Sequence, residues 1–366
     1  MGRSPHPQEY DRGTVGADGI SVEELQLAAR NHALPLEALR EPITPVGLHY
    51  LLIHFDIPSV DAAQWELRVG GLVERPLTLD LENLRSRPAR TLAVTLECAG
   101  NGRALFSPPA PASQPWLLEA VGTAEWTGTP LAPLLREAGL AAGAAEVVFT
   151  GLDRGVQGGV EHPYERSLSL EDALRDEVLL AYAANGAPLP PQHGYPLRLI
   201  VPGWYGMTHV KWLREITVGG GGFRGWQQAE SYTFRRTEDD EGTPVTRMLP
   251  RSLLVPPGIP EFLSRERFLE AGPCVVEGRA WSGWAAIERV EVSVDGGGTW
   301  ADAELDEAVS PFAWAGWRFT WAAEPGEYEL CCRASDAAGN TQPGEPDWNV
   351  GGYCNNAVQR VRVTVS

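Results

Sequence analysis

The segment LECAGNGR, residues 96–103, most constrains this chain because a strand pattern runs directly into a glycine turn. Leu92, Val94 and Leu96 alternate with other residues, as is typical of a half-buried strand. The glycines that follow allow a sharp turn in which the backbone can come close to a ligand. Cys98 is therefore expected at the end of a strand, facing inward, where a thiolate can bind a soft transition metal. Taken alone, the pattern more often belongs to a cysteine packed as a small hydrophobic residue.

A second segment, PPQHGYPLRLIVPGWYGMTHVKWLREI at Pro190–Ile216, gathers four potential hydrogen-bond donors in apolar, strand-like surroundings. They are His193, Arg198, His209 and Lys211. Any one of them alone could equally be a satisfied core or surface group. Their clustering around a glycine loop suits an anionic ligand, because backbone N–H groups can approach it while the cations neutralise its charge.

Charge and hydropathy bound the class of protein. The 366 residues carry a net charge of −18, which disfavours nucleic acid and anionic membranes as partners and favours a cationic protein. No apolar run approaches the roughly 18 residues that a membrane span needs, and residues 1–30 lack the layout of a secretory signal. These features predict a cytoplasmic protein without membrane contact. Five cysteines without a CxxC pair argue against a disulfide framework or a zinc site.

Three regions follow from the order of the apolar patterns. Residues 1–45 form an N-terminal arm with one helix at Ser21–Asn31, where Ser21 and Glu24 can make a capping box. Residues 46–245 mix short strands with helices and predict an α+β domain. Residues 246–366 are nearly all strand and predict an immunoglobulin-like sandwich. The expected strands of the middle region are Trp65–Val69, Thr91–Cys98, Glu146–Thr150, Leu197–Val201 and Glu215–Val218, with helices at Pro130–Ala138 and Leu170–Arg175.

The cysteine segment and the Pro190–Ile216 segment together resemble two signatures of the sulfite oxidase family of molybdopterin-dependent oxidoreductases. The C-terminal segments GRAWSGWAAIERVEVSVDGGGTW and DWNVGGYCNNAVQRVRVTV resemble the dimerisation domain of the same family. The resemblance covers most of the chain after about Pro45. It implies a molybdenum-molybdopterin cofactor, a homodimer, and two-electron oxygen-atom transfer on a small-molecule substrate.

The resemblance also implies roles for individual residues. Cys98 matches the molybdenum ligand, Tyr232 falls within one residue of a pocket tyrosine, and Arg103 matches an arginine just after the cysteine motif. These three are the expected catalytic residues. The expected cofactor-binding residues are His54, Cys98, Asp153, His193, Arg198, Thr208 and Lys211.

Departures from the family pattern bear on the substrate. Leu52 stands where family members that oxidise sulfite carry an arginine, and Ala285 or Ala286 stands at a second arginine position. A family lysine is replaced by Ser113 or Ala112. With two pocket arginines missing, sulfite is expected to be a poor substrate, since planar guanidinium groups recognise such oxyanions.

Other functions agree less well with the sequence. The Gly219–Gly222 run leads into no helix pattern, so the dinucleotide fingerprint is not met. No haem module is recognisable, so electrons are expected to leave through a separate carrier, and the net charge favours a cationic one. The alternatives are a reductase of S-oxides or N-oxides on the same cofactor, or a non-enzymatic scaffold or adhesion protein with a decayed cofactor domain.

The concentration of Trp281, Trp284, Trp314, Trp317 and Trp321 predicts a dimer interface in the C-terminal region.

Overall fold

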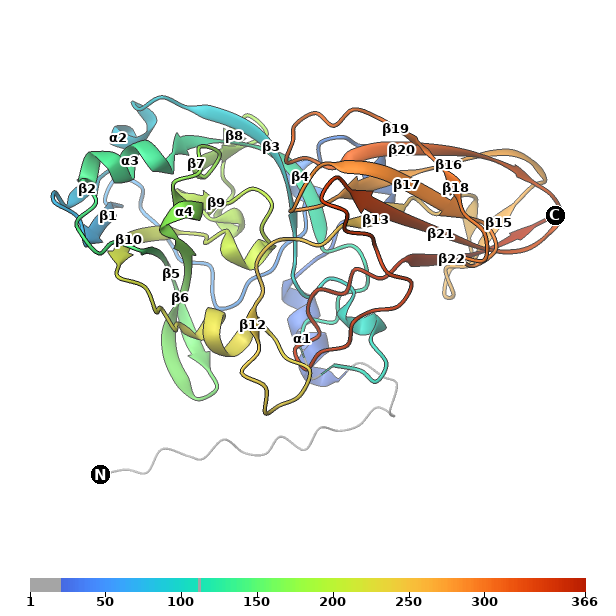
Figure 1. Ribbon diagram of the computed structural model, residues 1–366, viewed down its shortest axis with the longest axis horizontal. Coiled ribbons are helices and arrows are strands. Elements are labelled where there is room, and N and C mark those ends of the chain that lie inside the picture. Colours follow the sequence, from blue (N-terminus) through green and yellow to red (C-terminus); the bar gives the residue numbers. More distant parts are fainter. Residues whose placement is uncertain (1–20, 111–112) are drawn as a thin grey trace.

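The computed structural model describes residues 21–110 and 113–366. Figure 1 shows a helix-and-sheet body beside an all-strand body, with the two in contact along one side. Ala112 and residues 1–20 of the predicted arm lie outside the described residues. No helix among the described residues has both the length and the apolar character needed to cross a membrane.

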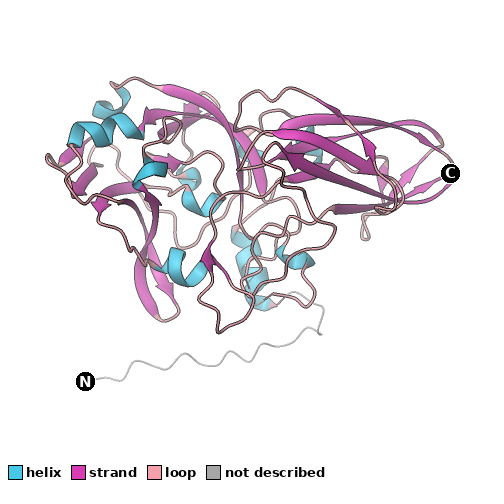
Figure 2. Ribbon diagram, in the orientation of Figure 1, coloured by secondary structure: helices cyan, strands magenta, loops and turns pink. Residues whose placement is uncertain are grey.

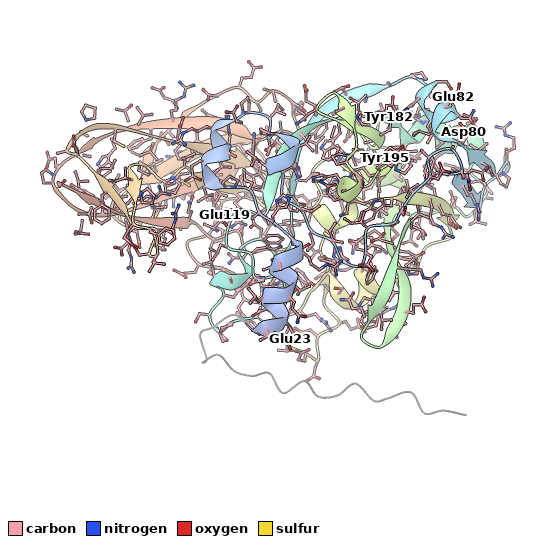
Figure 3. The ribbon with its side chains drawn as sticks, turned by 180° about the vertical axis from the view of Figure 1, so that it is seen from behind. Glu23, Asp80, Glu82, Glu119, Tyr182 and Tyr195 are labelled. Carbon is pink, nitrogen blue, oxygen red and sulfur yellow. The ribbon has the colours of Figure 1, made fainter. Side chains whose placement is uncertain are left out.

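The arm contains the predicted helix with the predicted cap. Helix α1 (Val22–Arg30) begins after Ser21, whose side chain accepts from the Glu24 backbone while the Glu24 side chain accepts from the Ser21 backbone. Glu23 in the first turn is labelled in Figure 3, and its charge suits the positive end of the helix dipole. After α1 the chain forms the short turns η1 (Leu36–Arg40) and η2 (Val46–Leu48).

The first body contains two sheets of five strands. In one sheet β1 and β10 are parallel and the other pairs are antiparallel; its order is β2 (Leu77–Leu79), β1 (Leu67–Gly71), β10 (Leu213–Gly219), β5 (Glu146–Gln157) and β6 (Val160–Ser169). The other sheet is antiparallel and joins β3 (Arg90–Glu97), β4 (Val121–Pro130), β7 (Leu179–Ala184) and β8 (Ala187–Pro188), with β9 (Arg198–Ile200) also on β7.

Three short helices pack in this body, between or beside the strands (Figure 2). They are α2 (Leu81–Arg85), α3 (Leu131–Ala138) and α4 (Leu170–Ala173). Asp80, labelled in Figure 3, caps α2 through the Asn83 backbone. Leu131, Leu134 and Leu135 recur at helical spacing in α3 and are fully buried in the main core of this body. The predicted α+β class is therefore confirmed.

The second body is a sandwich of two sheets, as predicted. The four-stranded sheet has the order β13 (Arg251–Leu254), β16 (Gly272–Trp281), β20 (Ala315–Ala323) and β19 (Glu304–Leu305). The six-stranded sheet has the order β14 (Ile259–Pro260), β15 (Arg267–Leu269), β22 (Gln359–Val365), β21 (Gly326–Asp336), β17 (Ile287–Ser293) and β18 (Ala301–Asp302). Val290, Val292, Leu330, Cys332 and Val363 pack between the sheets, which accounts for their alternation in sequence.

The two bodies share a core with the arm. Leu34 and Leu39 of the arm, Tyr205 and Tyr232 of the first body, and Trp281 of the second all belong to one buried cluster. Trp314 lies in this cluster as well, while Trp317 and Trp321 lie inside the sandwich. Of the five tryptophans expected at a dimer interface, only Trp284 is exposed. That interpretation was wrong for the other four, because they fill contacts within the chain.

Candidate functional site

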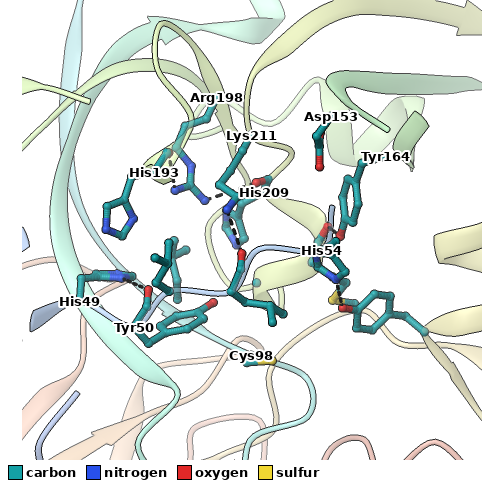
Figure 4. A pocket seen from close by; sticks show the side chains of 16 residues that line it. His49, Tyr50, His54, Cys98, Asp153, Tyr164, His193, Arg198, His209 and Lys211 are labelled. Carbon is teal, nitrogen blue, oxygen red and sulfur yellow. Dashed lines mark hydrogen bonds between the residues drawn. The ribbon is translucent and has the colours of Figure 1, made fainter. Parts of the chain in front are cut away.

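The cavity that contains the predicted site opens where β3, β9 and the segments after η2 and η5 (Gly206–Thr208) meet (Figure 4). It contains about 590 Å³ of empty space, part of it open to solvent. Its lining is His49, Tyr50, Leu51, Leu52, His54, Leu96, Cys98, Asp153, Tyr164, His193, Arg198, Gly206, Met207, His209, Lys211 and Tyr232.

Cys98 lies one residue after β3, at the start of the predicted turn. Its backbone N–H donates to Ala120 O at 2.9 Å, and Asn101 N–H donates back to Cys98 O at 2.9 Å. The side chain is buried and lines the cavity. Burial raises the pKa of the Cys98 thiol, while the positive charge of Arg103 opposes that rise. The thiol is therefore placed to meet a ligand in the cavity, and Arg103 favours the thiolate that a metal requires.

Arg198, at the start of β9, and His193, in η4 (Pro191–His193), lie together on one wall. The Arg198 guanidinium donates from Nη1 to His193 O at 3.0 Å and from Nη2 to His209 O at 3.3 Å. It also lies 4.7 Å from the ring centroid of Trp126. Its Nε is buried and has no partner among the described residues. Burial lowers the pKa of Arg198 to about 10, so the group stays cationic at neutral pH.

Lys211 and Asp153 form a second charged region of the wall. The Lys211 ammonium donates to Leu52 O at 2.8 Å and to Gln192 O at 3.1 Å. Burial lowers the pKa of Lys211 to about 7 and raises that of Asp153 to about 6, and each charge opposes the shift of the other group. Asp153 Oδ1 is buried without a partner among the described residues. Both groups can therefore still form a hydrogen bond or an ion pair with a polar ligand.

His54 and Tyr232 come from distant parts of the chain and meet at the cavity. The Tyr232 hydroxyl and His54 Nε2 are 2.5 Å apart. Burial lowers the pKa of His54 to about 3 and raises that of Tyr232 well above its ordinary value, so both groups are neutral. When His54 carries its proton on Nε2, it donates to the phenol oxygen and leaves the phenol proton available to a ligand. The Tyr164 ring lies 4.7 Å from the His54 ring, and its hydroxyl donates to Met207 O at 2.7 Å. The Tyr164 ring thereby packs against the His54 imidazole and limits its movement.

His209 lines the cavity but offers no donor to a ligand. Its Nδ1 accepts from Val201 N–H at 3.0 Å, so Nε2 carries the proton and donates to Trp204 O at 3.0 Å. Burial lowers the pKa of His209 to about 3. The expectation of a ligand donor here was wrong, because the imidazole joins the two ends of the 201–209 loop.

Two expected site residues lie behind the lining rather than in it. Thr208 is fully buried, and its hydroxyl has no partner among the described residues. Arg103 is buried as well, with Nε donating to Gly351 O at 3.1 Å and Nη1 to Gln114 O at 3.1 Å. The structure therefore brings seven of the nine expected residues to one cavity: His54, Cys98, Asp153, His193, Arg198, Lys211 and Tyr232.

The residues that differ from the family pattern do not all line the Cys98 cavity. Leu52 lines the cavity, but Ala285 and Ala286 line a separate one beside Ile287 and Asp306. The two alanines therefore do not line the Cys98 cavity of the same chain, contrary to the expectation that one of them replaces a second pocket arginine. Three titratable lining residues, His49, Tyr50 and Tyr164, were not expected. His49 and Tyr50 directly precede the segment that contains His54, which was their only signal in the sequence.

The donor set fits an anionic pterin cofactor with one sulfur ligand from the protein. Cys98 supplies the sulfur, Arg198 and Lys211 supply positive charge, and the unpartnered Asp153 oxygen can bond to a further polar atom. These residues approach from four segments of the first body, so the site exists only in the folded chain.

Comparison with known proteins agrees with this chemistry. Residues 54–226 match the oxidoreductase molybdopterin binding domain, and residues 245–366 match the Mo-co oxidoreductase dimerisation domain. Sulfite oxidase of Gallus gallus is 37% identical over 349 residues, covering 89% of this chain and 74% of that protein. Nitrate reductase [NADH] 1 of Arabidopsis thaliana is 33% identical over 360 residues, covering 88% of this chain and 38% of that protein.

Among solved structures, the sulfane dehydrogenase SoxCD from Paracoccus pantotrophus superimposes with a TM-score of 0.77 at 28% identity. The match covers 91% of this chain and 86% of that one. Fold and site together thus define a molybdopterin-dependent oxidoreductase. The chain belongs to the sulfite oxidase family, with a molybdopterin-binding domain followed by a dimerisation domain. It spans about three quarters of the chicken enzyme and less than two thirds of the mouse and human sulfite oxidases.

Proposed function

We propose that this protein transfers an oxygen atom, with two electrons, to or from a small substrate that is not sulfite. The observation that carries the proposal is Leu52, an apolar side chain in the cavity wall at a position where sulfite-oxidising relatives are expected to carry an arginine. A charge-assisted hydrogen bond contributes about 1.5–3 kcal/mol, so its loss selects against a small dianion. A neutral or partly apolar substrate suits this wall better.

The cofactor, when bound, supplies the two-electron oxygen exchange. The chain would supply placement and charge: Cys98 would hold the metal, and Arg198 and Lys211 would neutralise the anionic part of the pterin. Asp153 and His193 in the lining, and Thr208 behind it, would help to orient the pterin. Arg103 acts from behind the wall by favouring the thiolate form of Cys98. Tyr232 keeps its proton because its pKa is raised, so its hydroxyl can donate to an oxygen of the substrate.

The direction of transfer separates two candidates. Relatives include both sulfite oxidases and nitrate reductases, and the latter name supports the alternative of a reductase acting on an S-oxide or N-oxide. Family membership favours either enzyme over a scaffold or adhesion protein. Steady-state assays can decide: sulfite with an artificial acceptor should give slow turnover, while an uncharged S-oxide with a reduced dye should be converted if the reductase is correct. Sulfite turnover at kcat/KM above about 10⁶ M⁻¹s⁻¹ would contradict the proposed specificity.

The partners follow from the second domain and from the charge. We infer a homodimer through residues 246–366, and the surface that supports it is an exposed apolar patch on the β14–β15 hairpin. Ile259, Phe262 and Leu263 are 71%, 81% and 83% exposed, and Phe268, which pairs with Ile259, is exposed as well. An exposed apolar patch of this kind in a dimerisation domain suits a second copy of the chain. We also infer a separate electron carrier as a partner. A cationic carrier suits the net charge of −18 on this chain.

A further inference from the structure

The turn that bears Cys98 is held by the C-terminal domain as well as by its own domain. Cys354 N–H donates to Ala99 O at 2.8 Å, and the Asn355 side chain donates to Gly102 O at 2.8 Å. Gly102 has φ +88°, and a Cβ there would lie 3.0 Å from the Asn355 side chain. The backbone of residues 98–103 therefore packs closely against the 351–355 segment, and a side chain at Gly102 would be strained.

Glu97, the residue before Cys98, anchors this contact. Its carboxylate is fully buried and receives three donors: Arg251 Nη1 at 2.7 Å, Trp281 Nε1 at 2.9 Å and Asn101 Nδ2 at 3.0 Å. Arg251, in β13, and Trp281, in β16, belong to the C-terminal domain. Arg251 Nη1 also reaches Asn101 O at 3.3 Å. One arginine thus contacts both the start and the end of the turn.

Asn101 links the Glu97 carboxylate to the opposite side of the turn through hydrogen bonds. Its amide donates to Leu118 O at 2.9 Å, and its Oδ1 accepts from Ala120 N–H at 3.1 Å. Ala120 O in turn accepts from Cys98 N–H. The Glu97 carboxylate and the Cys98 backbone are therefore joined through one continuous hydrogen-bonded ring.

We propose that Arg251 and Glu97 are positioning residues that set the direction of the Cys98 sulfur, so that the domain named for dimerisation is also part of the cofactor site. The proposal rests on the role of Cys98 as the metal ligand. A buried ion pair contributes little net stability compared with an apolar pair of similar volume, whereas groups that orient a metal ligand affect the metal strongly. The pair is thus better explained by the turn it holds than by stability.

The test uses the full-length holoenzyme and two variants. Arg251→Lys keeps a positive charge beside Glu97, but the lysine side chain ends one bond short of the position of Nη1, which makes both contacts to Glu97 and Asn101. Glu97→Gln/Arg251→Met removes both charges together, so no charge is left buried without a partner. Both variants should melt near the wild-type temperature. We expect a loss of about 10-fold or more in molybdenum affinity or activity and altered g-values in the Mo(V) electron paramagnetic resonance spectrum.

Arg279→Met is the matched control. Arg279 lies in β16 and donates to Leu39 O and Arg40 O of the arm, each at 2.7 Å, so its loss breaks an interdomain contact that does not touch the turn. Its spectrum and molybdenum content should be those of the wild type. Folded Arg251 variants with wild-type spectrum and molybdenum content would overturn the positioning role. A wild-type protein that binds no molybdenum would instead overturn the proposed function, and this inference with it.

Discussion

The hydroxyl of Tyr232 lies 2.5 Å from Nε2 of His54, joining two residues 178 positions apart in the chain. Because the pKa of the imidazole is lowered to about 3, His54 is neutral at physiological pH, and its Nε2–H tautomer donates to the phenol oxygen and orients it. The phenol proton then remains as a neutral donor in the cavity that Cys98 also lines. Such a donor can stabilise an oxygen that gains negative charge during transfer.

Tyr232→Phe should lower kcat by about 100-fold while changing the melting temperature little, because a single preorganised donor to a developing charge contributes on this scale. Steady-state kinetics with the best substrate measure the effect. Tyr353→Phe is the control, since the Tyr353 ring lies 5.1 Å from that of Tyr232 but does not line the cavity. Equal rates for wild type and Tyr232→Phe would remove the tyrosine from the mechanism.

Cys98→Ser should abolish turnover and leave the fold intact. A hydroxyl is a poor ligand for molybdenum compared with a thiolate, while serine occupies a similar volume at this buried position. Activity assays combined with circular dichroism melting curves measure the two effects separately. Full turnover in the variant would disprove the assignment of Cys98.

The sequence predicted those parts of the site that lie in continuous motifs. The capping box of α1, the strand before Cys98 and the donors of His193, Arg198 and Lys211 depend on neighbouring residues, and the structure places them as expected. Tyr164 was missed because it reaches the cavity from β6, where a tyrosine alternating with polar residues has only a packing signature. The tryptophans of the second domain were misinterpreted because residue counts cannot distinguish burial within a chain from burial between copies. The domain boundaries at residues 45 and 245 stay predictions.

The fold should lose stability steeply below about pH 6.5. Burial lowers the pKa of four histidines: to about 4 for His49, about 3 for His54 and His209, and about 2 for His193. Between those values and 6.5 the unfolded chain binds more protons than the folded one, so acid favours unfolding, at up to about 1.4 kcal/mol per pH unit for each histidine. Asp153, whose pKa is raised to about 6, has the opposite effect on the free energy of unfolding, but it is a single group against four.

Urea unfolding of the cofactor-free chain between pH 4 and 8 measures this dependence. His209→Gln should reduce the slope of the unfolding free energy below pH 6.5 by about one histidine's share, up to 1.4 kcal/mol per pH unit. An unchanged slope would show that His209 is not protonated on unfolding in this range.

Leu52→Arg should raise kcat/KM for sulfite by about 10- to 100-fold, because a charge-assisted hydrogen bond of about 1.5–3 kcal/mol would then reach the substrate. The same change should lower activity toward an uncharged S-oxide. Leu52→Gln is the control, since it adds polarity without charge. If both variants accelerate sulfite equally, charge is not the determinant of specificity at this wall.

Phe262→Glu/Leu263→Glu should convert the dimer to a monomer without unfolding the sandwich. Both side chains are more than four-fifths exposed in the single chain, so the substitutions remove no packing within it, whereas two carboxylates buried in an interface cost several kcal/mol. Light scattering at micromolar concentration measures the mass. Val309→Glu is the control, because Val309 is 60% exposed and lies outside the β14–β15 hairpin. A wild-type monomer, or a dimer unaffected by the double substitution, would place the contact between copies elsewhere or exclude it.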